Sequence, residues 1–249
     1  SALDWAVELS ANSKVNLIHR RDEFRGAQST LNKVYELEKE IHSLNEGKVK
    51  FWNENAADKE TMLNRVQEIK SLIKDGYVKL LMHSIAFGST TNFFQPSPVK
   101  QRQMDMTQHV MAHCLIYWTQ ALMDEGLLLK GSRVLGLTSE GSYKAMEGYG
   151  PVGVSKASLE AVVRQIGWEL GNKGITANTI QAGITATRAL TKISDNWEEW
   201  VEETKKRNPM KRLTTPEDVA GLVSLLMSDK ADFINCSTIF CDGGEHRSI

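Results

Sequence analysis

Tyr149-Gly150-Pro151-Val152-Gly153-Val154-Ser155-Lys156 lies where a strand pattern gives way to a helix pattern. Apolar residues at 134–137 predict a short strand before it, and the periodicity at 154–170, stopped by Gly171, predicts a long helix. The same alternation runs along the rest of the chain. We expect further strands at 15–18, 49–52, 78–82, 175–180 and 238–241, and further helices at 26–44, 59–74, 104–123 and from 215 onward.

This alternation predicts an α/β fold, a doubly wound and mostly parallel sheet with helices on both faces. The 249 residues are long enough to bury the core of one large domain, and no composition break divides them. Ligands of such folds bind at the carboxyl ends of the strands. Each predicted strand end is therefore a candidate position for a functional residue.

Composition excludes several classes of protein. The chain is 41% hydrophobic, with 30 basic and 31 acidic side chains interspersed, which does not favour a nucleic-acid-binding protein. No apolar run approaches the ~20 residues of a membrane span, and no secretory signal pattern begins the chain, so we expect a cytoplasmic protein without a membrane partner. Three unpaired cysteines favour neither disulfides nor zinc, and His109 and His113, one turn apart, lack a third ligand, so no metal is expected.

Three residues around the opening motif carry the chemistry. Ser139 follows the strand at 134–137, Tyr149 begins the turn, and Lys156 lies seven residues after Tyr149. This order resembles the short-chain dehydrogenase/reductase family, in which a serine, a tyrosine and a lysine form the catalytic group on a Rossmann-like fold. An unperturbed phenol has a pKa near 10, so a nearby ammonium would stabilise its phenolate or ease proton delivery. The plainer alternative is a surface turn followed by a solvated lysine.

The spacing narrows the resemblance to one branch. Most family members place tyrosine and lysine four residues apart, whereas seven is the spacing of the enoyl-acyl-carrier-protein reductases. His83-Ser84-Ile85-Ala86-Phe87 resembles a motif of that branch, and the run at 152–161 is similar to its NADPH-using form. The resemblance implies an NAD(P)H-dependent oxidoreductase of fatty-acid synthesis, acting on an acyl thioester, free or bound to a carrier protein. It also implies a homotetramer or homodimer packed through helices near 106–123 and 154–170.

Cofactor contacts follow from the resemblance, residue by residue. His19-Arg20-Arg21 places basic groups where relatives carry an acid for the ribose of NAD, so we expect NADPH in preference to NADH, although a solvated helix start would look the same. Glu54 and Asn55 match an adenine-contacting pair, and Lys156 would also bind the nicotinamide ribose. Ser84, Ile85 and Ala86 match the segment that passes beneath the cofactor. Gly183, Thr185 and Thr187 match the loop that binds the nicotinamide carboxamide.

The chain departs from the family pattern at its start. Residues 1–6 match the helix that follows the family's first strand and glycine-rich turn, so about 15 to 20 residues of the pattern have no counterpart. We expect an omitted N-terminal segment and treat 1–249 as one reductase domain. Within it, 184–208 has weak periodicity and resembles the substrate flap. Trp197 and Trp200 would there cover an acyl chain, with core packing as the alternative.

The expected reaction is NADPH-dependent reduction of the trans-2 double bond of an enoyl thioester. Tyr149 would stabilise the enolate oxygen, Lys156 would supply positive charge, and Ser139 would position the thioester carbonyl. Because Ser139 also occurs in carbonyl reductases, a 3-ketoacyl reductase or alcohol dehydrogenase remains an alternative. A non-catalytic dinucleotide sensor or scaffold is the other, favoured by the absent glycine turn.

Overall fold

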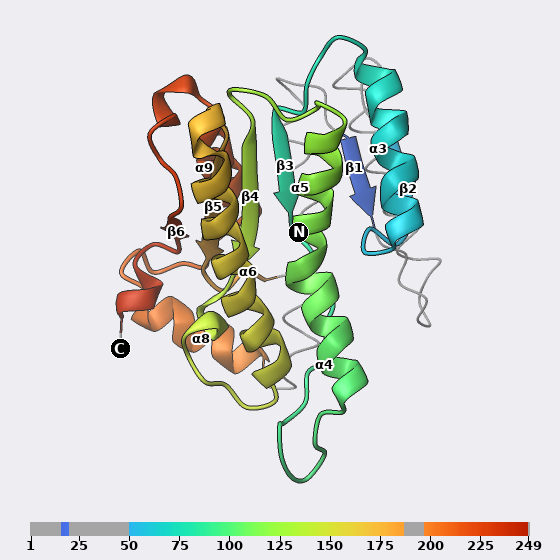
Figure 1. Cartoon of the computed structure of the whole chain (residues 1–249). Helices are drawn as coiled ribbons and strands as arrows, with labels where there is room; N and C mark the ends of the chain where they lie inside the picture. The colour runs from blue at the N-terminus through green and yellow to red at the C-terminus, as the bar shows by residue number, and fades with distance from the viewer. Residues whose placement is uncertain (1–15, 20–49, 187–196, 249) are drawn as a thin grey trace.

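The computed structural model describes residues 16–19, 50–186 and 197–248 and confirms the α/β fold class (Figure 1). Strands β3, β4, β5 and β6 form a parallel sheet in that order, and β1 pairs in parallel with β2. The sequence predicted each of these strands to within two residues of its bounds. The strands are β1 (Asn16–His19), β2 (Lys50–Asn53), β3 (Leu80–His83), β4 (Arg133–Thr138), β5 (Thr176–Ala182) and β6 (Thr238–Cys241).

Helices lie on both faces of the sheet. The predicted helix at 104–123 is divided into α4 and α5 by a π-helical turn at His109–His113, while the helix predicted at 26–44 lies outside the described residues. Helix α6 begins four residues earlier than predicted, because Pro151 is compatible with the first turn of a helix. The described helices are α3 (Lys59–Ile73), α4 (Gln101–Gln108), α5 (Cys114–Asp124), α6 (Gly150–Leu170), α8 (Trp197–Arg207) and α9 (Pro216–Leu226).

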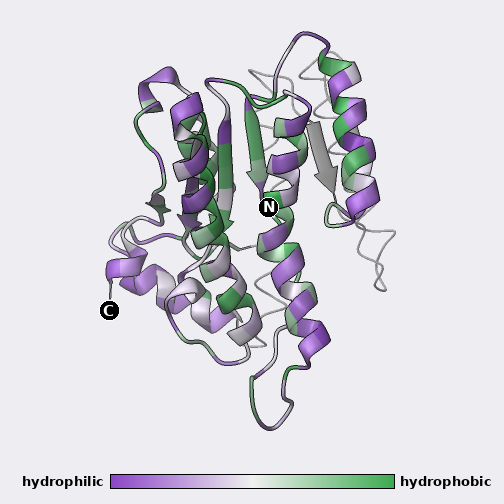
Figure 2. Cartoon of the chain, viewed as in Figure 1, coloured by the Kyte–Doolittle hydropathy of each residue, from purple (hydrophilic) through white to green (hydrophobic). Residues whose placement is uncertain are grey.

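Alternate residues of the central strands face two hydrophobic cores. Val134 of β4 packs with α3, α5 and α6, whereas the next residue, Leu135, packs with α9. Ala177 and Ile180 of β5 divide in the same way, as the pleat of a strand requires. The sheet is therefore covered on both faces. Its strands are mostly hydrophobic, whereas the helices carry many hydrophilic residues (Figure 2).

The parallel register brings the strand ends to one edge. His83, Thr138, Ala182 and Cys241 are the last residues of β3, β4, β5 and β6, so the segments that follow them lie side by side. Within the described ranges, no helix is both long and apolar enough to cross a membrane.

Candidate active site

Ser139 and Tyr149 meet at the carboxyl end of β4. Ser139 directly follows the strand, Tyr149 is the residue before α6, and their hydroxyl oxygens share a hydrogen bond of 3.4 Å. The tyrosine ring packs against Gly141, where an added Cβ would come within 2.4 Å of a ring carbon. Glycine at 141 is therefore what lets the turn fold over Tyr149.

Lys156 lies one and a half turns into α6 and points its ammonium at the same strand end. The side chain is buried, and Nζ donates a 2.6 Å hydrogen bond to the main-chain oxygen of Leu137. Burial lowers the pKa of Lys156 to about 8, although the charge of Glu160 opposes this effect. Thr138 in turn donates a hydrogen bond to Glu160 at 2.6 Å. The end of β4 therefore holds both the ammonium and its counter-charge.

The phenol of Tyr149 stays protonated in this setting. Burial raises its pKa above the ordinary value of 10, an effect that the hydrogen bond from Ser139 opposes and the charge of Glu140 reinforces. The hydroxyl of Tyr149 is therefore a hydrogen-bond donor at neutral pH, and not a standing phenolate.

His83 is buried beside the site, a property that its motif did not reveal. Its Nε2 atom lies 3.1 Å from the carbonyl oxygen of Val110 in the π-helical turn and 3.4 Å from the sulfur of Cys114. Burial, with a contribution from the charge of Lys156, lowers the pKa of His83 to about 4. The imidazole is therefore neutral at physiological pH.

The loop after β5 contains two of the predicted cofactor residues, Gly183 and Thr185. The Thr185 hydroxyl donates to the carbonyl of Gly183 at 3.1 Å, and the Ile184 amide donates to the carboxylate of Glu245 at 3.1 Å. An added Cβ at Gly183 would lie 2.5 Å from the Thr214 hydroxyl, so this position needs glycine. Sequence reasoning missed Glu245, whose signal was an acid directly after the Gly243-Gly244 turn.

Most of the remaining predicted cofactor residues end or follow strands β1, β2 and β3. Ser84, Ile85 and Ala86 follow β3 at the same edge of the sheet. Glu54 pairs with Arg65 at 3.1 Å, and Asn55 accepts a hydrogen bond from the Ala57 amide, so both have local partners after β2. His19 ends β1, and its side chain, together with Arg20, Arg21 and Thr187, lies outside what the structure describes.

A cavity of about 700 Å³ opens beside Tyr149. It lies between the loop at 92–95, the turn at 141–150 and the first turns of α6, and several of its walls are aromatic. Tyr143, a residue that the sequence did not single out, lines it and accepts a 3.1 Å hydrogen bond from the side-chain amide of Gln181 in β5.

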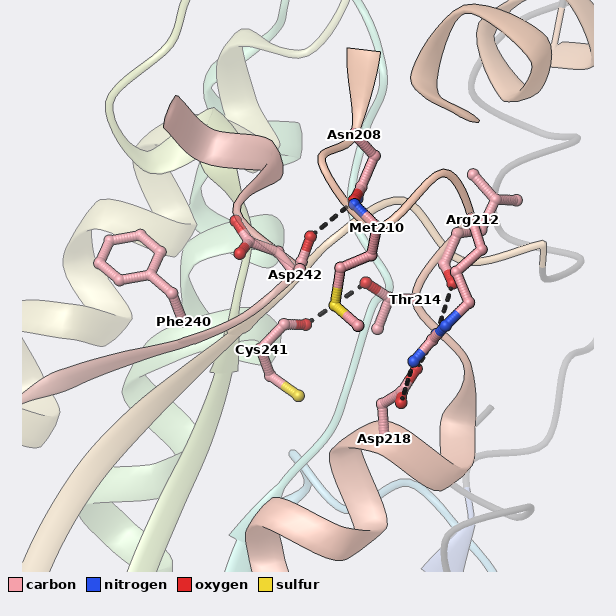
Figure 3. Close-up of a pocket in the computed structure, with 10 residues that line it drawn as sticks. Asn208, Met210, Arg212, Thr214, Asp218, Phe240, Cys241 and Asp242 are labelled. Atoms are coloured by element: carbon pink, nitrogen blue, oxygen red, sulfur yellow. Dashed lines mark hydrogen bonds and ion pairs between the residues drawn. The ribbon is translucent and has the colours of Figure 1, made fainter. Parts of the chain in front are cut away.

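A second cavity, of about 140 Å³, lies at the carboxyl end of β6 and contains none of the predicted catalytic residues (Figure 3). Its walls are held by internal bonds: Arg212 forms an ion pair with Asp218 at 2.5 Å, and Asn208 donates to the main chain of Asp242 at 2.9 Å. This cavity adjoins the segment that carries Glu245.

The predicted flap is described only in parts, 184–186 and α8. Trp197 and Trp200 are both half-buried on α8, and neither belongs to the two hydrophobic cores formed by the described residues. His109, weighed earlier as a metal ligand, contacts the carbonyl oxygen of Ala57 at 2.7 Å instead.

Solved structures share this fold. A FabI–NADH complex from Alistipes finegoldii superimposes with a TM-score of 0.83, covering 99% of this chain and 84% of that chain at 16% identity. An enoyl-(acyl-carrier-protein) reductase from Anaplasma phagocytophilum, solved with NAD, gives a TM-score of 0.76, with 98% and 87% coverage at 23% identity. At these identities the likeness establishes the Rossmann-like fold.

Curated relatives correct the cofactor expectation. The NADH-dependent enoyl-[acyl-carrier-protein] reductase FabI of Enterococcus faecalis is 30% identical over 172 residues, which is 69% of this chain and 68% of that protein. FabI of Buchnera aphidicola, also named for NADH, is 30% identical over 216 residues, 86% of this chain and 79% of the relative. The expectation of NADPH from His19-Arg20-Arg21 is therefore wrong. Basic charge near a strand end carries no selectivity unless a guanidinium fork is held against the 2′-phosphate, and composition does not show that geometry.

The family assignment rests on most of the chain. The sequence profile described as enoyl-(acyl carrier protein) reductase matches residues 23–246, and the relative from Enterococcus faecalis and one from Rhizobium meliloti each match over 68% of their own length. The protein belongs to the enoyl-(acyl carrier protein) reductase family, a branch of the short-chain dehydrogenase/reductase oxidoreductases.

Proposed function

We propose that this protein reduces the trans-2 double bond of an enoyl thioester, carried by acyl carrier protein, with NADH. The observation that carries this proposal is the hydrogen bond of 3.4 Å between Ser139 and Tyr149 at the end of β4, where the buried ammonium of Lys156 also binds Leu137, in a chain related to NADH-dependent enoyl reductases. The reaction would belong to fatty-acid synthesis.

Tyr149 is the proton donor in this scheme. Its phenol is neutral because burial raises its pKa, so the hydroxyl hydrogen is available for the thioester oxygen. Addition of a hydride at the β-carbon would leave an enolate, whose oxygen the Tyr149 hydroxyl would stabilise without reorganisation. A proton added at the α-carbon would then complete the saturated thioester, so that one hydride and one proton are gained across the double bond. Ser139 holds the Tyr149 hydroxyl through their shared hydrogen bond.

The residues present fit a nicotinamide cofactor. An ammonium has three N–H donors, and among the described residues Lys156 uses one, on Leu137, leaving two for ribose hydroxyls. NADH, when bound, supplies the hydride. Lys156 would orient the ribose and lend positive charge to the site. The segments expected to hold the rest of the cofactor are Ser84–Ala86 and Gly183–Thr185.

The cavity of about 700 Å³ beside Tyr149 suits an acyl chain. Phe93, Phe94, Met146 and Val154 are among its lining residues and offer apolar surface. Trp197 and Trp200 would add to this surface as part of the flap at 184–208.

The assay is NADH oxidation with crotonyl-acyl carrier protein as substrate, compared with acetoacetyl thioester and with each substrate omitted. Turnover of the enoyl substrate supports the proposal. Preference for the ketone would support a carbonyl reductase, which the Ser139–Tyr149 hydrogen bond also favours. NADH binding without any turnover would support a dinucleotide sensor, and either result contradicts enoyl reduction.

Assembly as a homotetramer or homodimer is part of the same proposal. Tyr117 on α5 and Trp168 on α6 are large apolar residues with 43% and 77% of their surfaces exposed, which supports contact with a second copy. Light scattering after size-exclusion chromatography tests this, and a monomeric mass contradicts it. The cytoplasmic location stays a prediction.

A further inference from the structure

The carboxylate of Glu245 joins three segments that are distant in sequence. Its two oxygens lie 3.1 Å and 3.4 Å from the amide nitrogen of Ile184, in the loop after β5. One of them also accepts from the guanidinium of Arg207, the last residue of α8, at 3.3 Å. Glu245 itself belongs to the short turn Glu245–Arg247 that follows β6.

The neighbouring turn holds Glu245 in place. The carboxylate of Asp242 accepts from the amide of Gly244 at 2.9 Å and from the amide and ring of His246 at 2.9 Å and 2.6 Å. Asn208, directly after α8, donates to the Asp242 carbonyl (Figure 3). The Glu245 carboxylate lies so close to the main chain that an added Cβ at Gly183 would be 2.6 Å from it. The end of α8, the loop after β5 and the turn after β6 are thus packed around one charge.

This charge is costly where it lies. The side chain of Glu245 is only 2% exposed, whereas its cationic partner Arg207 is 28% exposed. Burial raises the pKa of Glu245 above 4.5 even though the Ile184 amide and Arg207 oppose the rise, and the charges of Glu140 and Asp242 add to it. A buried carboxylate whose partners do not offset its desolvation destabilises the fold at neutral pH. The contacts of this carboxylate with the Ile184 amide and Arg207 point to a role in holding the loop after β5 against α8.

We propose that Glu245 is a positioning residue for the cofactor: its carboxylate fixes the Ile184 amide, and so the segment Gly183–Thr185, and links that segment to α8 through Arg207. This inference rests on the proposed function, in which Gly183–Thr185 holds the nicotinamide end of NADH. The charge, beyond the shape of the side chain, is what joins the loop to α8.

The pH dependence follows from the groups that face Glu245. These are Arg207 from α8, Glu140 from the turn after β4, and Asp242, paired with His246, from its own turn. As pH falls through the raised pKa of Glu245, the carboxylate gains a proton and the charged link to Arg207 is lost. The KM for NADH is then expected to rise on the acidic side.

The test compares Glu245→Gln with Glu125→Gln, a change at the end of α5 and outside both cavities that removes an ion pair to Lys70. Glutamine keeps the size of the side chain and an oxygen for the Ile184 amide but loses the charge. We expect the Kd and KM for NADH to rise about 3- to 10-fold in E245Q, with kcat changed less than about twofold. The acidic rise in KM should disappear, and the unfolding temperature near pH 7.5 should not fall. E125Q should match the wild type in NADH affinity.

Arg207→Gln provides a second route to the same answer. It should raise the Kd for NADH by a factor similar to E245Q, and the double variant should show little further loss, because both changes break one link. Unchanged NADH affinity in E245Q, or additive effects in the double variant, would overturn the proposal. If the wild type binds NADH but does not reduce the enoyl thioester, the proposed function fails, while the Kd measurements still decide the role of Glu245.

Discussion

The ammonium of Lys156 donates a 2.6 Å hydrogen bond to the main-chain oxygen of Leu137, which ties helix α6 to the end of strand β4. This single contact places a buried cation at the edge of the sheet where Ser139 and Tyr149 meet. The cation has been taken out of water, so its protonation responds to the pH range in which an enzyme works.

Turnover should therefore decline as pH rises through about 8, where Lys156 loses its charge. The measurement is kcat/KM for crotonyl-acyl carrier protein between about pH 6 and 10. Lys156→Arg keeps a cation throughout this range, so its lower activity should lack the alkaline decline. A wild-type profile that stays flat to about pH 10 would contradict the assigned pKa.

The same burial makes a prediction about stability. Lys156 has an ordinary pKa of 10.5 in the unfolded chain and about 8 in the fold, so between these values the unfolded chain binds more protons. The free energy of unfolding of the wild type should therefore increase as the pH rises from about 8 to 10.5. Lys156→Met removes that gain, and urea unfolding at about pH 7 and pH 9.5 should show a smaller increase in the variant. An equal increase in both proteins argues against a strained lysine.

Tyr149→Phe should lower kcat by about 10²- to 10⁴-fold, because the donor to the developing oxyanion is lost. Ser139→Ala should cost about tenfold, since it removes only the hydrogen bond that holds the phenol. NADH affinity should change little in either variant. Tyr77→Phe, at an exposed position before β3, is the control. Full activity in Y149F would remove Tyr149 from the mechanism.

Periodicity predicted most of the fold because the described elements follow local rules. The strands at 134–137 and 238–241 are apolar runs between turns. Thr215 before Pro216 predicts a helix start, and in the structure Thr215 is the N-cap of α9 and forms a capping box with Asp218. The π-helical turn at His109–His113 was missed, since its five residues keep the apolar pattern of an ordinary helix.

The sequence predicted site residues only where they lie close together in one motif. Ser139 and Tyr149 meet within an 18-residue stretch that ends at Lys156, whose ammonium reaches Leu137 at the end of the same strand, so local spacing was enough to place all three at one strand end. Glu245 reaches the loop after β5 from 61 residues away, and no local pattern encodes that contact. The raised pKa of Tyr149 likewise depends on burial, which the sequence does not state.

His83 should weaken the fold at acidic pH. Its pKa is about 4 in the fold against 6.5 in the unfolded chain, so between these values the unfolded chain binds more protons and stability falls as pH falls. His83→Gln should show a smaller loss of urea midpoint from about pH 6.5 to 4. His113→Gln, at the end of the π-helical turn, is the matched control and should follow the wild type. Identical acid behaviour in H83Q and the wild type would show that His83 is not buried as a neutral ring.

Glu160 contacts the end of β4 and, through its charge, affects the pKa of Lys156. Its carboxylate accepts from Thr138 at 2.6 Å and opposes the fall in the Lys156 pKa that burial causes. Glu160→Gln keeps an acceptor for Thr138 but removes the charge, so the pKa of Lys156 should fall further below 8. The alkaline decline of kcat/KM should then begin at lower pH, while activity near pH 6 stays close to that of the wild type. Glu169→Gln, at an exposed position of the same helix α6, should leave the profile unmoved. Desolvation of the ammonium would be the same in both variants, so a shift confined to E160Q isolates the electrostatic contribution of Glu160. If E160Q shows no shift, burial alone sets the pKa of Lys156.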